Sequence, residues 1–284
     1  EVVVRRLVRD DSALVRRECA VSLHQLDSPR SVQLWVELAL QHDGNDRWYL
    51  EALGIGEAGK EAACLDAWLE NAGTRWNSPA GRDIIWRSRA PEAARLIARV
   101  LLDPGVPATG HPRLLRSLDF HHGPGKEAAL VALLTADSGQ NPATWLEAFK
   151  RADAEFLRAH PEISEHAGSV LLASKGTVTF VDLVARFDRR DMTGHLMEMT
   201  LSDPENEPGI RAVAQVMAFE QWDPIWKALA DPARATQFIK AIRSVGNVHA
   251  KNYLSGVVTN EAQPEATRLL AIEAMGQTPV PVRE

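Results

Sequence analysis

Hydrophobic positions recur along this chain with the period of an α-helix. Apolar residues return every three or four positions, and clusters of Pro, Gly, Asp and Asn interrupt them at short intervals. Leu65, Trp68 and Leu69 illustrate the spacing, because they fall on one face of a helix. Residues 177–181 are rich in β-branched side chains, but they share a helical frame with the apolar residues that follow, and we predict a helix there as well. The pattern therefore predicts an all-α fold.

The interruptions set the expected helix ends. Ser28 and Pro29 are residue types favoured at the N-cap and at the first helical position, so one helix should begin there. Gly-rich and Pro-containing turns separate other segments in the same way. We expect helices over residues 12–26, 30–41, 46–55, 60–71, 79–88, 91–102, 111–120, 125–135, 141–149, 152–159, 163–174, 176–187, 190–202, 208–220, 222–230, 233–245, 248–259 and 264–276.

Three segments share a second pattern, in which an Arg follows an apolar or β-branched residue and small residues come at helical spacing after it. They are Val15–Leu23, Ile210–Met217 and Thr267–Met275. Small residues at that spacing let two helices approach closely, while the Arg stem covers the seam and its head stays in water. The pattern is typical of stacked helix pairs of the HEAT type. We predict an α-solenoid, an α-α superhelix of about six or seven degenerate HEAT-like pairs.

Such repeats predict one elongated domain, because each pair packs only on its neighbours. We expect a single array over residues 1–277. Its repeats are best defined over 11–136 and looser over 141–277, where the spacing between the Arg-marked helices varies. Residues 278–284 contain two prolines and are expected to form an extended tail or linker.

Composition narrows the choice of partner. Of 284 residues, 32 are Lys or Arg and 38 are Asp or Glu, which gives a net charge of −6. A nucleic acid requires a basic face, so we expect a protein partner and no nucleic acid. No apolar run is long enough to span a bilayer, which predicts no membrane insertion. Cys19 and Cys64 fall at helical apolar positions and are interpreted as small buried hydrophobes, with a disulfide left open.

The sequence lacks the residue patterns of metal and haem sites. It contains no CxxC, no CxxCH and no Cys/His cluster, so we expect no metal and no cofactor. None of the nine His is followed by Glu, which excludes the di-iron hydroxylases of this architecture. His121 and His122 are adjacent in a Gly/Pro turn and would point in different directions, so we interpret the segment as a surface turn and not as a metal site.

One part of the chain resembles a known family. The segments Asp43–Gly56 and Trp76–Ala90, with the helix at Val15–Leu23, resemble the HEAT-repeat part of large planctomycete and verrucomicrobial proteins labelled membrane-bound dehydrogenases. The resemblance covers residues 11–90 well, whereas residues 100–284 match only as generic HEAT-like helices. The resemblance implies a parent protein with the domain order of that family, which is an N-terminal β-propeller, then the HEAT segment, and then a c-type cytochrome domain with a CxxCH motif.

The resemblance implies a role and a compartment but no chemistry. This sequence has neither the propeller nor the CxxCH motif, so the family's redox residues have no counterpart in it. The implied role is that of a helical spacer between a dehydrogenase domain and a haem domain, in a fragment of a larger secreted redox protein. A periplasmic or other extracytoplasmic location is also implied, because c-type haem is attached there.

Aromatic and basic residues are dense between residues 47 and 89. Rings beside guanidinium groups can form a stacking or cation–π surface for a partner loop or a sugar. In the competing interpretation the rings fill the core and the Arg stems cover them. An excess of Arg over residues 82–116 could also dock an acidic neighbour. The candidate partner-binding residues are Arg47, Trp48, Tyr49, Arg82, Trp86, Arg87 and Arg89.

These patterns favour a scaffold over an enzyme. Solenoids mostly bind and position other domains, and the chain has no phosphate loop, nucleophile elbow or evident catalytic carboxylate pair. We predict a non-catalytic scaffold or protein-interaction module. The alternative is an enzyme in the concave groove of the solenoid, hydrolytic or similar to HEAT-like DNA glycosylases. It requires a deep pocket in which an acidic group with a shifted pKa lies beside an aromatic wall.

Overall fold

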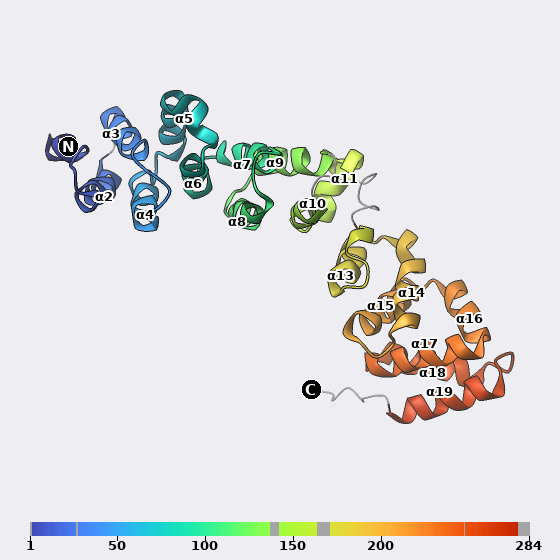
Figure 1. The fold of residues 1–284 in the computed structure, drawn as a ribbon. Helices are drawn as coiled ribbons and strands as arrows, with labels where there is room; N and C mark the ends of the chain where they lie inside the picture. The colour runs from blue at the N-terminus through green and yellow to red at the C-terminus, as the bar shows by residue number, and fades with distance from the viewer. Residues whose placement is uncertain (1, 27, 137–141, 164–170, 247, 278–284) are drawn as a thin grey trace. The chain divides into compact units, whose positions relative to one another are not determined.

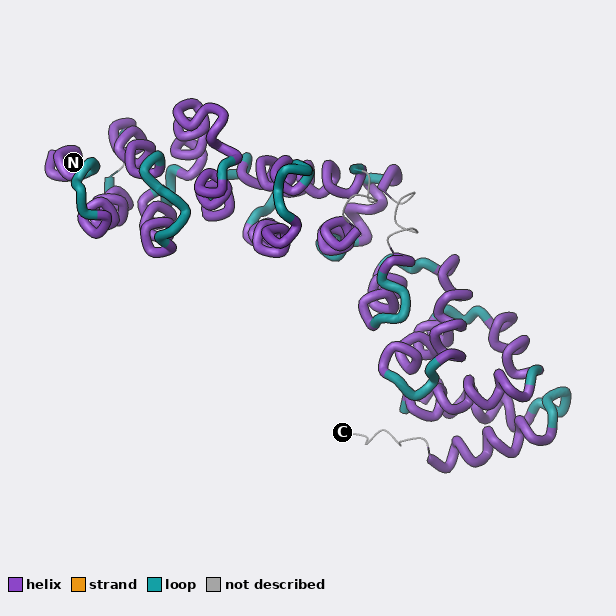
Figure 2. The backbone as a smooth tube through the Cα atoms, viewed as in Figure 1, coloured by secondary structure: helices purple, strands orange, loops and turns teal. Residues whose placement is uncertain are grey.

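The computed structural model describes residues 2–26, 28–136, 142–163, 171–246 and 248–277. These residues form helices and the loops that join them, and no strand occurs among them (Figures 1 and 2). The prediction of an all-α fold is confirmed. The chain divides into two compact units, Glu1–His166 and Ala167–Glu284.

Short helices in two rows build the first unit (Figure 1). Their bounds are α1 (Val2–Leu7), α2 (Ala13–Ser22), α3 (Pro29–Ala39), α4 (Arg47–Gly56), α5 (Glu61–Ala72), α6 (Pro79–Arg87), α7 (Ala93–Leu101), α8 (His111–Ser117), α9 (Pro124–Thr135), α10 (Pro142–Phe149) and α11 (Ala154–Ala159). In one row α2, α4, α6, α8 and α10 each pack on the next. In the other row α3 packs on α5, and α7 packs on α9. Helices two apart in sequence are therefore neighbours in space.

Helices α2 and α4 come into backbone contact. Ala20 of α2 is fully buried, and a Cβ atom added to Gly56 of α4 would overlap the Ala20 carbonyl oxygen. Since that oxygen belongs to a helix backbone, only glycine permits this approach. Small residues of the Val15–Leu23 pattern thus lie at a close helix–helix contact, as predicted.

Capping residues fix where these helices begin. The Ser28 hydroxyl accepts a hydrogen bond from the Ser31 amide at 3.1 Å, and Pro29 occupies the first helical position, as predicted. The Asp46 carboxylate caps α4 in the same way and accepts from the Tyr49 amide at 3.0 Å. The second cap fixes the first turn of α4, which carries several of the predicted partner-binding residues.

The second unit also consists of packed helices. Their bounds are α13 (Val178–Arg186), α14 (Thr193–Ser202), α15 (Glu207–Ala218), α16 (Trp222–Ala230), α17 (Pro232–Val245), α18 (Val248–Thr259) and α19 (Glu265–Gln277). Helices α13, α15, α17 and α19 pack in series, and α14, α16 and α18 each pack on the helix that follows. The β-branched stretch at 177–181 begins α13, as predicted, because Phe180, Val181 and Val184 are buried together.

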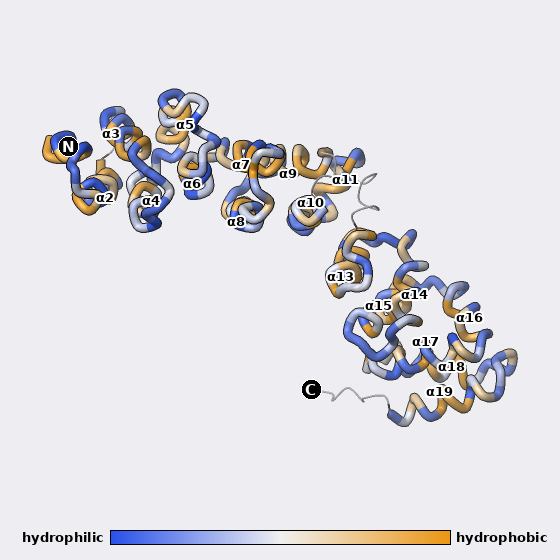
Figure 3. The backbone as a smooth tube through the Cα atoms, viewed as in Figure 1, coloured by the Kyte–Doolittle hydropathy of each residue, from blue (hydrophilic) through white to orange (hydrophobic). Residues whose placement is uncertain are grey.

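The helices of both units each carry apolar as well as polar residues (Figure 3). Among the largest core groups is Trp35 of α3, whose indole N–H donates to the Leu53 carbonyl of α4 at 2.8 Å. Cys19 and Cys64 are buried and free, which confirms their interpretation as small hydrophobes. Burial raises the pKa of the Cys64 thiol to about 12, so the thiol is unreactive.

The structure differs from some of the expectations drawn from the sequence, and others it does not test. Helix α1 was not predicted, and it buries no side chain. The helix expected at 163–174 lies largely outside the described residues, and the tail at 278–284 lies wholly outside them. The contacts divide the expected 1–277 array after His166, and its continuity as one HEAT-like array stays a prediction. No helix in the described part of the chain is both long and apolar enough to cross a bilayer.

Candidate functional site

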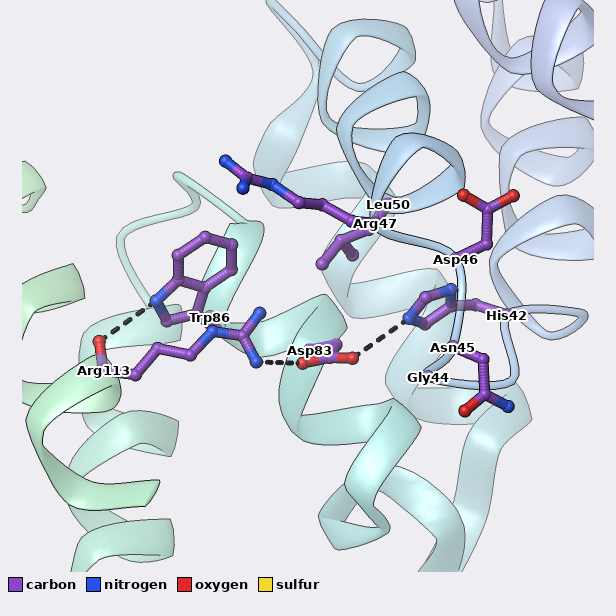
Figure 4. A pocket seen from close by; sticks show the side chains of 9 residues that line it. All are labelled: His42, Gly44, Asn45, Asp46, Arg47, Leu50, Asp83, Trp86 and Arg113. Carbon is purple, nitrogen blue, oxygen red and sulfur yellow. Dashed lines mark hydrogen bonds and ion pairs between the residues drawn. The ribbon is translucent and has the colours of Figure 1, made fainter. Parts of the chain in front are cut away.

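A surface pocket of about 410 Å³ lies in the first unit, between the loop that precedes α4 and the helices α4, α6 and α8 (Figure 4). The loop and the first turn of α4 form one wall, α6 contributes the middle, and α8 contributes the opposite rim. The lining residues are His42, Gly44, Asn45, Asp46, Arg47, Leu50, Asp83, Trp86 and Arg113.

Asp83 of α6 is the central polar group of this pocket (Figure 4). One carboxylate oxygen is 3.3 Å from Nε2 of His42, and the other is 2.5 Å from a guanidinium nitrogen of Arg113. Only 14% of the Asp83 side chain is exposed, and burial by itself would raise the pKa of this carboxyl. The hydrogen bonds from His42 and Arg113 lower the pKa by more than burial raises it. The pKa therefore lies below its usual value, and Asp83 is an anion that joins three segments of the first unit.

His42 follows α3 and belongs to the core, with 1% of its side chain exposed. Its ring stacks on Tyr49 at a centroid distance of 6.2 Å, and the Tyr49 hydroxyl donates to the Leu38 carbonyl at 3.0 Å. Because a carboxylate only accepts hydrogen bonds, Nε2 of His42 is the donor to Asp83. Nδ1 of the same ring is buried without a partner. The contact with Asp83 is thus the one hydrogen bond that holds this ring.

Arg113 and Trp86 hold each other at the rim. The guanidinium carbon of Arg113 is 4.0 Å from the Trp86 ring centroid, and the indole N–H donates to the Arg113 carbonyl at 3.1 Å. Across the pocket, Arg47 is exposed, and no hydrogen bond or ion pair joins its guanidinium to another described residue. Its neighbour Trp48 is 69% exposed. The site therefore offers an exposed guanidinium group, that of Arg47, and the indole rings of Trp48 and Trp86.

The structure separates the seven predicted partner-binding residues. Arg47 and Trp86 line the pocket, and Trp48 lies beside it in the first turn of α4. Tyr49 is buried among the helices, so for this residue the core interpretation applies.

The other three arginines have structural contacts. Arg82 donates to the carbonyl of Asn77 at 2.9 Å and so fixes the turn before α6. Arg87 forms an ion pair with Glu51 of α4 at 2.9 Å. Arg89 donates to three carbonyl oxygens at the end of α6, at 3.0 to 3.2 Å. These arginines serve helix packing, and the surface open to a partner is smaller than the sequence predicted.

Sequence reasoning did not identify His42, Asp83 and Arg113 as a group. The contacts of Asp83 reach residues 41 and 30 positions away in the chain. The repeat register would have been needed to find these partners.

A second group of ionisable side chains lies inside the same unit. Glu57 follows α4, is 2% exposed, and has one carboxyl oxygen without a hydrogen-bond partner. Burial raises its pKa to about 8, although Arg87 and Arg89 act in the opposite direction. His121 is also buried, and this burial lowers its pKa to about 4. The turn is at the surface, but the imidazole packs inward.

Replacement of Asp83 with alanine should destabilise the protein by about 1–3 kcal/mol at neutral pH, because buried His42 loses its hydrogen bond. Since the folded-state pKa of Asp83 is lowered, this stabilisation exists above the usual aspartate range and disappears as the pH falls through the folded-state pKa. Urea unfolding at neutral and acidic pH measures both effects. Asp119→Ala is the matched control, since its ion pair with Arg151 is half-exposed and should contribute less than about 1 kcal/mol. Equal losses in the two variants would contradict the assignment.

Neither a metal cluster nor a known relative indicates an activity. Within the described ranges, no group of three or more His, Cys, Asp or Glu side chains is arranged to hold a metal ion. Comparison of the chain with protein-family models, with curated proteins and with solved structures finds no match.

Proposed function

We propose that this chain is a non-catalytic scaffold, an α-solenoid of HEAT-like helix pairs, which binds a protein partner at the pocket of the first unit. The packing of α2, α4, α6, α8 and α10 each on the next supports the proposal, because stacked pairs that contact only their neighbours are what a solenoid requires. The observation that carries the binding role is the open pocket beside the exposed side chains of Arg47 and Trp48.

The charges around the pocket favour an acidic segment of the partner. The Asp83 carboxylate is already bonded on both oxygens, whereas no ion pair joins the guanidinium of Arg47 to a described residue, although Asp46 lines the same pocket. An Asp or Glu side chain would complete a charge-assisted pair with Arg47. Trp48 and Trp86 would supply the apolar contact, and Trp and Arg are the residue types that contribute most to binding energy in protein interfaces.

The pKa of Asp83, the central acidic group of the pocket, favours binding over catalysis. An enzyme in this groove would need an acidic group whose pKa is raised towards neutral pH. The pKa of Asp83 is lowered instead, and its two oxygens are engaged. Glu57 has a raised pKa, but it is almost completely buried and is not among the residues that line this pocket.

We further propose that the chain is part of a larger secreted redox protein, in the periplasm or outside the cell. This proposal rests on the resemblance of residues 11–90. The partner is then a flanking domain, and the helical array sets the distance between a dehydrogenase domain and a haem domain.

Photo-crosslinking of the native, full-length protein tests this function. A photoreactive phenylalanine analogue in place of Trp48 should crosslink to an Asp- or Glu-rich segment, which mass spectrometry would locate in a flanking domain or in another chain. A c-type haem band in the same preparation would support the redox parent. The control position is Leu269 of α19, which is also an exposed apolar residue. Equal crosslinking from both positions, or none from Trp48, contradicts the proposal.

A further inference from the structure

The second unit contains its own pocket, with an aromatic lining. Its volume is about 350 Å³, and it is formed by the end of α15, by α16 and by α18. The lining residues are Met217, Glu220, Trp222, Trp226, Asn252, Tyr253 and Gly256. None of them was singled out by the sequence, and none belongs to the site of the first unit.

Two of the aromatic rings form a stack in this pocket. The rings of Trp222 and Tyr253 are nearly parallel, with an interplanar angle of 18° and a centroid distance of 4.8 Å. Trp222 is nevertheless 44% exposed. Trp226, one turn further along α16, is partly exposed and also lines the pocket. The stack holds the Trp222 indole in a fixed orientation while much of it stays accessible to a ligand.

The hydroxyl of Tyr253 has no hydrogen-bond partner, although only 7% of the residue is exposed. Burial raises the pKa of this phenol, so it stays protonated. A buried hydroxyl without a partner destabilises the folded protein. The oxygen itself has almost no accessible surface, so it does not reach a ligand in the pocket.

Glu220 is the one charged residue that lines this pocket. It follows the last turn of α15 with a φ of 54°, a backbone region that favours glycine and is strained for other residues. No ion pair joins its carboxylate to another described residue, and the side chain is exposed. A strained backbone thus keeps an open carboxylate beside the aromatic rings.

We propose that this pocket binds an organic cation, a methylated ammonium group with its positive charge spread over an apolar surface. The ring faces, the Met217 thioether and the Glu220 carboxylate are all electron-rich, and no Lys or Arg lines the pocket. Aromatic faces attract such cations, and a nearby carboxylate adds to the attraction. An anion would be repelled, and a neutral ligand would gain nothing from the charge of Glu220.

Binding of choline to the full chain tests the proposal. Its neutral isostere, 3,3-dimethylbutan-1-ol, has the same shape without the charge, so calorimetry and tryptophan fluorescence should give choline at least about tenfold tighter binding. Equal affinity of the two compounds, or no choline binding in the folded protein, overturns the proposal. Trp48→Ala, in the first unit, is the control variant and should leave choline binding unchanged.

Two substitutions of Glu220 separate binding from folding. Glu220→Gln should weaken choline binding about tenfold and leave the isostere unaffected, since only the charge is removed. Glu220→Gly should raise the thermal midpoint, because glycine accepts the positive φ, and should weaken choline binding at least as much. A stabilised glycine variant that binds choline like the original protein contradicts the role of the carboxylate.

The same chemistry has two possible sources, a free quaternary amine or a methylated lysine of another protein. A short peptide containing trimethyllysine, compared with the same peptide containing unmodified lysine and with choline, distinguishes them. Tighter binding of the trimethyllysine peptide than of choline identifies a protein side chain as the ligand. Equal binding of choline and the peptide identifies a free amine, and either result supports the cation site.

Discussion

Replacement of Gly56 with alanine is expected to destabilise the first unit by about 2–3 kcal/mol, although alanine is the better helix former by about 1 kcal/mol. The added Cβ would overlap the carbonyl oxygen of Ala20 in α2 and would also approach the ring of Trp35. The carbonyl belongs to a helix backbone and cannot rotate away as a side chain does. Relief therefore requires α2 and α4 to separate, which loosens the row of helices that positions the pocket.

Urea unfolding followed by far-UV circular dichroism measures this change. Gly194→Ala is the matched control, because Gly194 also lies in a helix, is exposed, and has no atom within 4 Å of an added Cβ. That variant should be neutral or more stable by up to about 1 kcal/mol. If Gly56→Ala is as stable as the control variant, α2 and α4 do not pack as described. The photo-crosslink from residue 48 should be lost in Gly56→Ala and kept in Gly194→Ala.

Glu57→Gln should stabilise the protein increasingly as the pH rises, by about 2–4 kcal/mol between pH 5 and pH 8. The carboxyl of Glu57 is buried, and burial raises its pKa from the ordinary value of 4.5 to about 8. Between these two values the folded protein keeps a proton that the unfolded chain releases. The contribution of Glu57 to the stability of the original protein therefore falls with rising pH across this window, by up to about 1.4 kcal/mol per pH unit. Glutamine keeps the shape and has no proton to lose.

His121 should produce the opposite slope at lower pH. Its folded-state pKa is about 4, below the ordinary value of 6.5, so the folded protein resists protonation of the ring. Stability from this residue is full above 6.5 and falls as the pH drops towards 4. The two windows overlap between pH 4.5 and pH 6.5, where the opposite slopes offset each other, so stability should be nearly level there and should fall above pH 6.5.

Thermal unfolding from pH 4 to pH 9 checks both slopes in one series. Glu57→Gln and the original protein should be similarly stable near pH 4 and diverge above pH 5. Glu70→Gln, an exposed position on α5, should follow the original protein throughout. Parallel curves for the original protein and Glu57→Gln would falsify the burial of this carboxyl.

Most of the helices could be predicted because their determinants are local. The cap at Ser28 and Pro29 depends on neighbouring residues, and the structure contains the expected bond from the Ser31 amide. The β-branched segment before Leu183 is helical because a run of apolar side chains at helical spacing faces the core, and that spacing is visible in the sequence. Helix α1 was missed, although Val4, Leu7 and Val8 have helical spacing in the sequence.

The candidate site could be predicted only in part. The first turn of α4 was chosen as part of the candidate patch, but adjacent residues of a helix point about 100° apart, so Trp48 is exposed while Tyr49 is buried. The arginines of the predicted patch were interpreted together because they are close in sequence. In space, Arg87 pairs with α4 and Arg89 caps α6, and both are thereby withdrawn from the surface.

The sequence by itself determined the all-α class, the helix ends and the close contacts made by small residues, since periodicity, capping and side-chain size act over a few residues. Only the tertiary structure decided which polar groups meet. Asp83 bonds to His42 and Arg113, which lie 41 and 30 positions away in the sequence. Glu57 is shielded from solvent because helices pack around it. Such partners depend on the register between helices. That register is a property of packing over long separations, which local patterns do not contain.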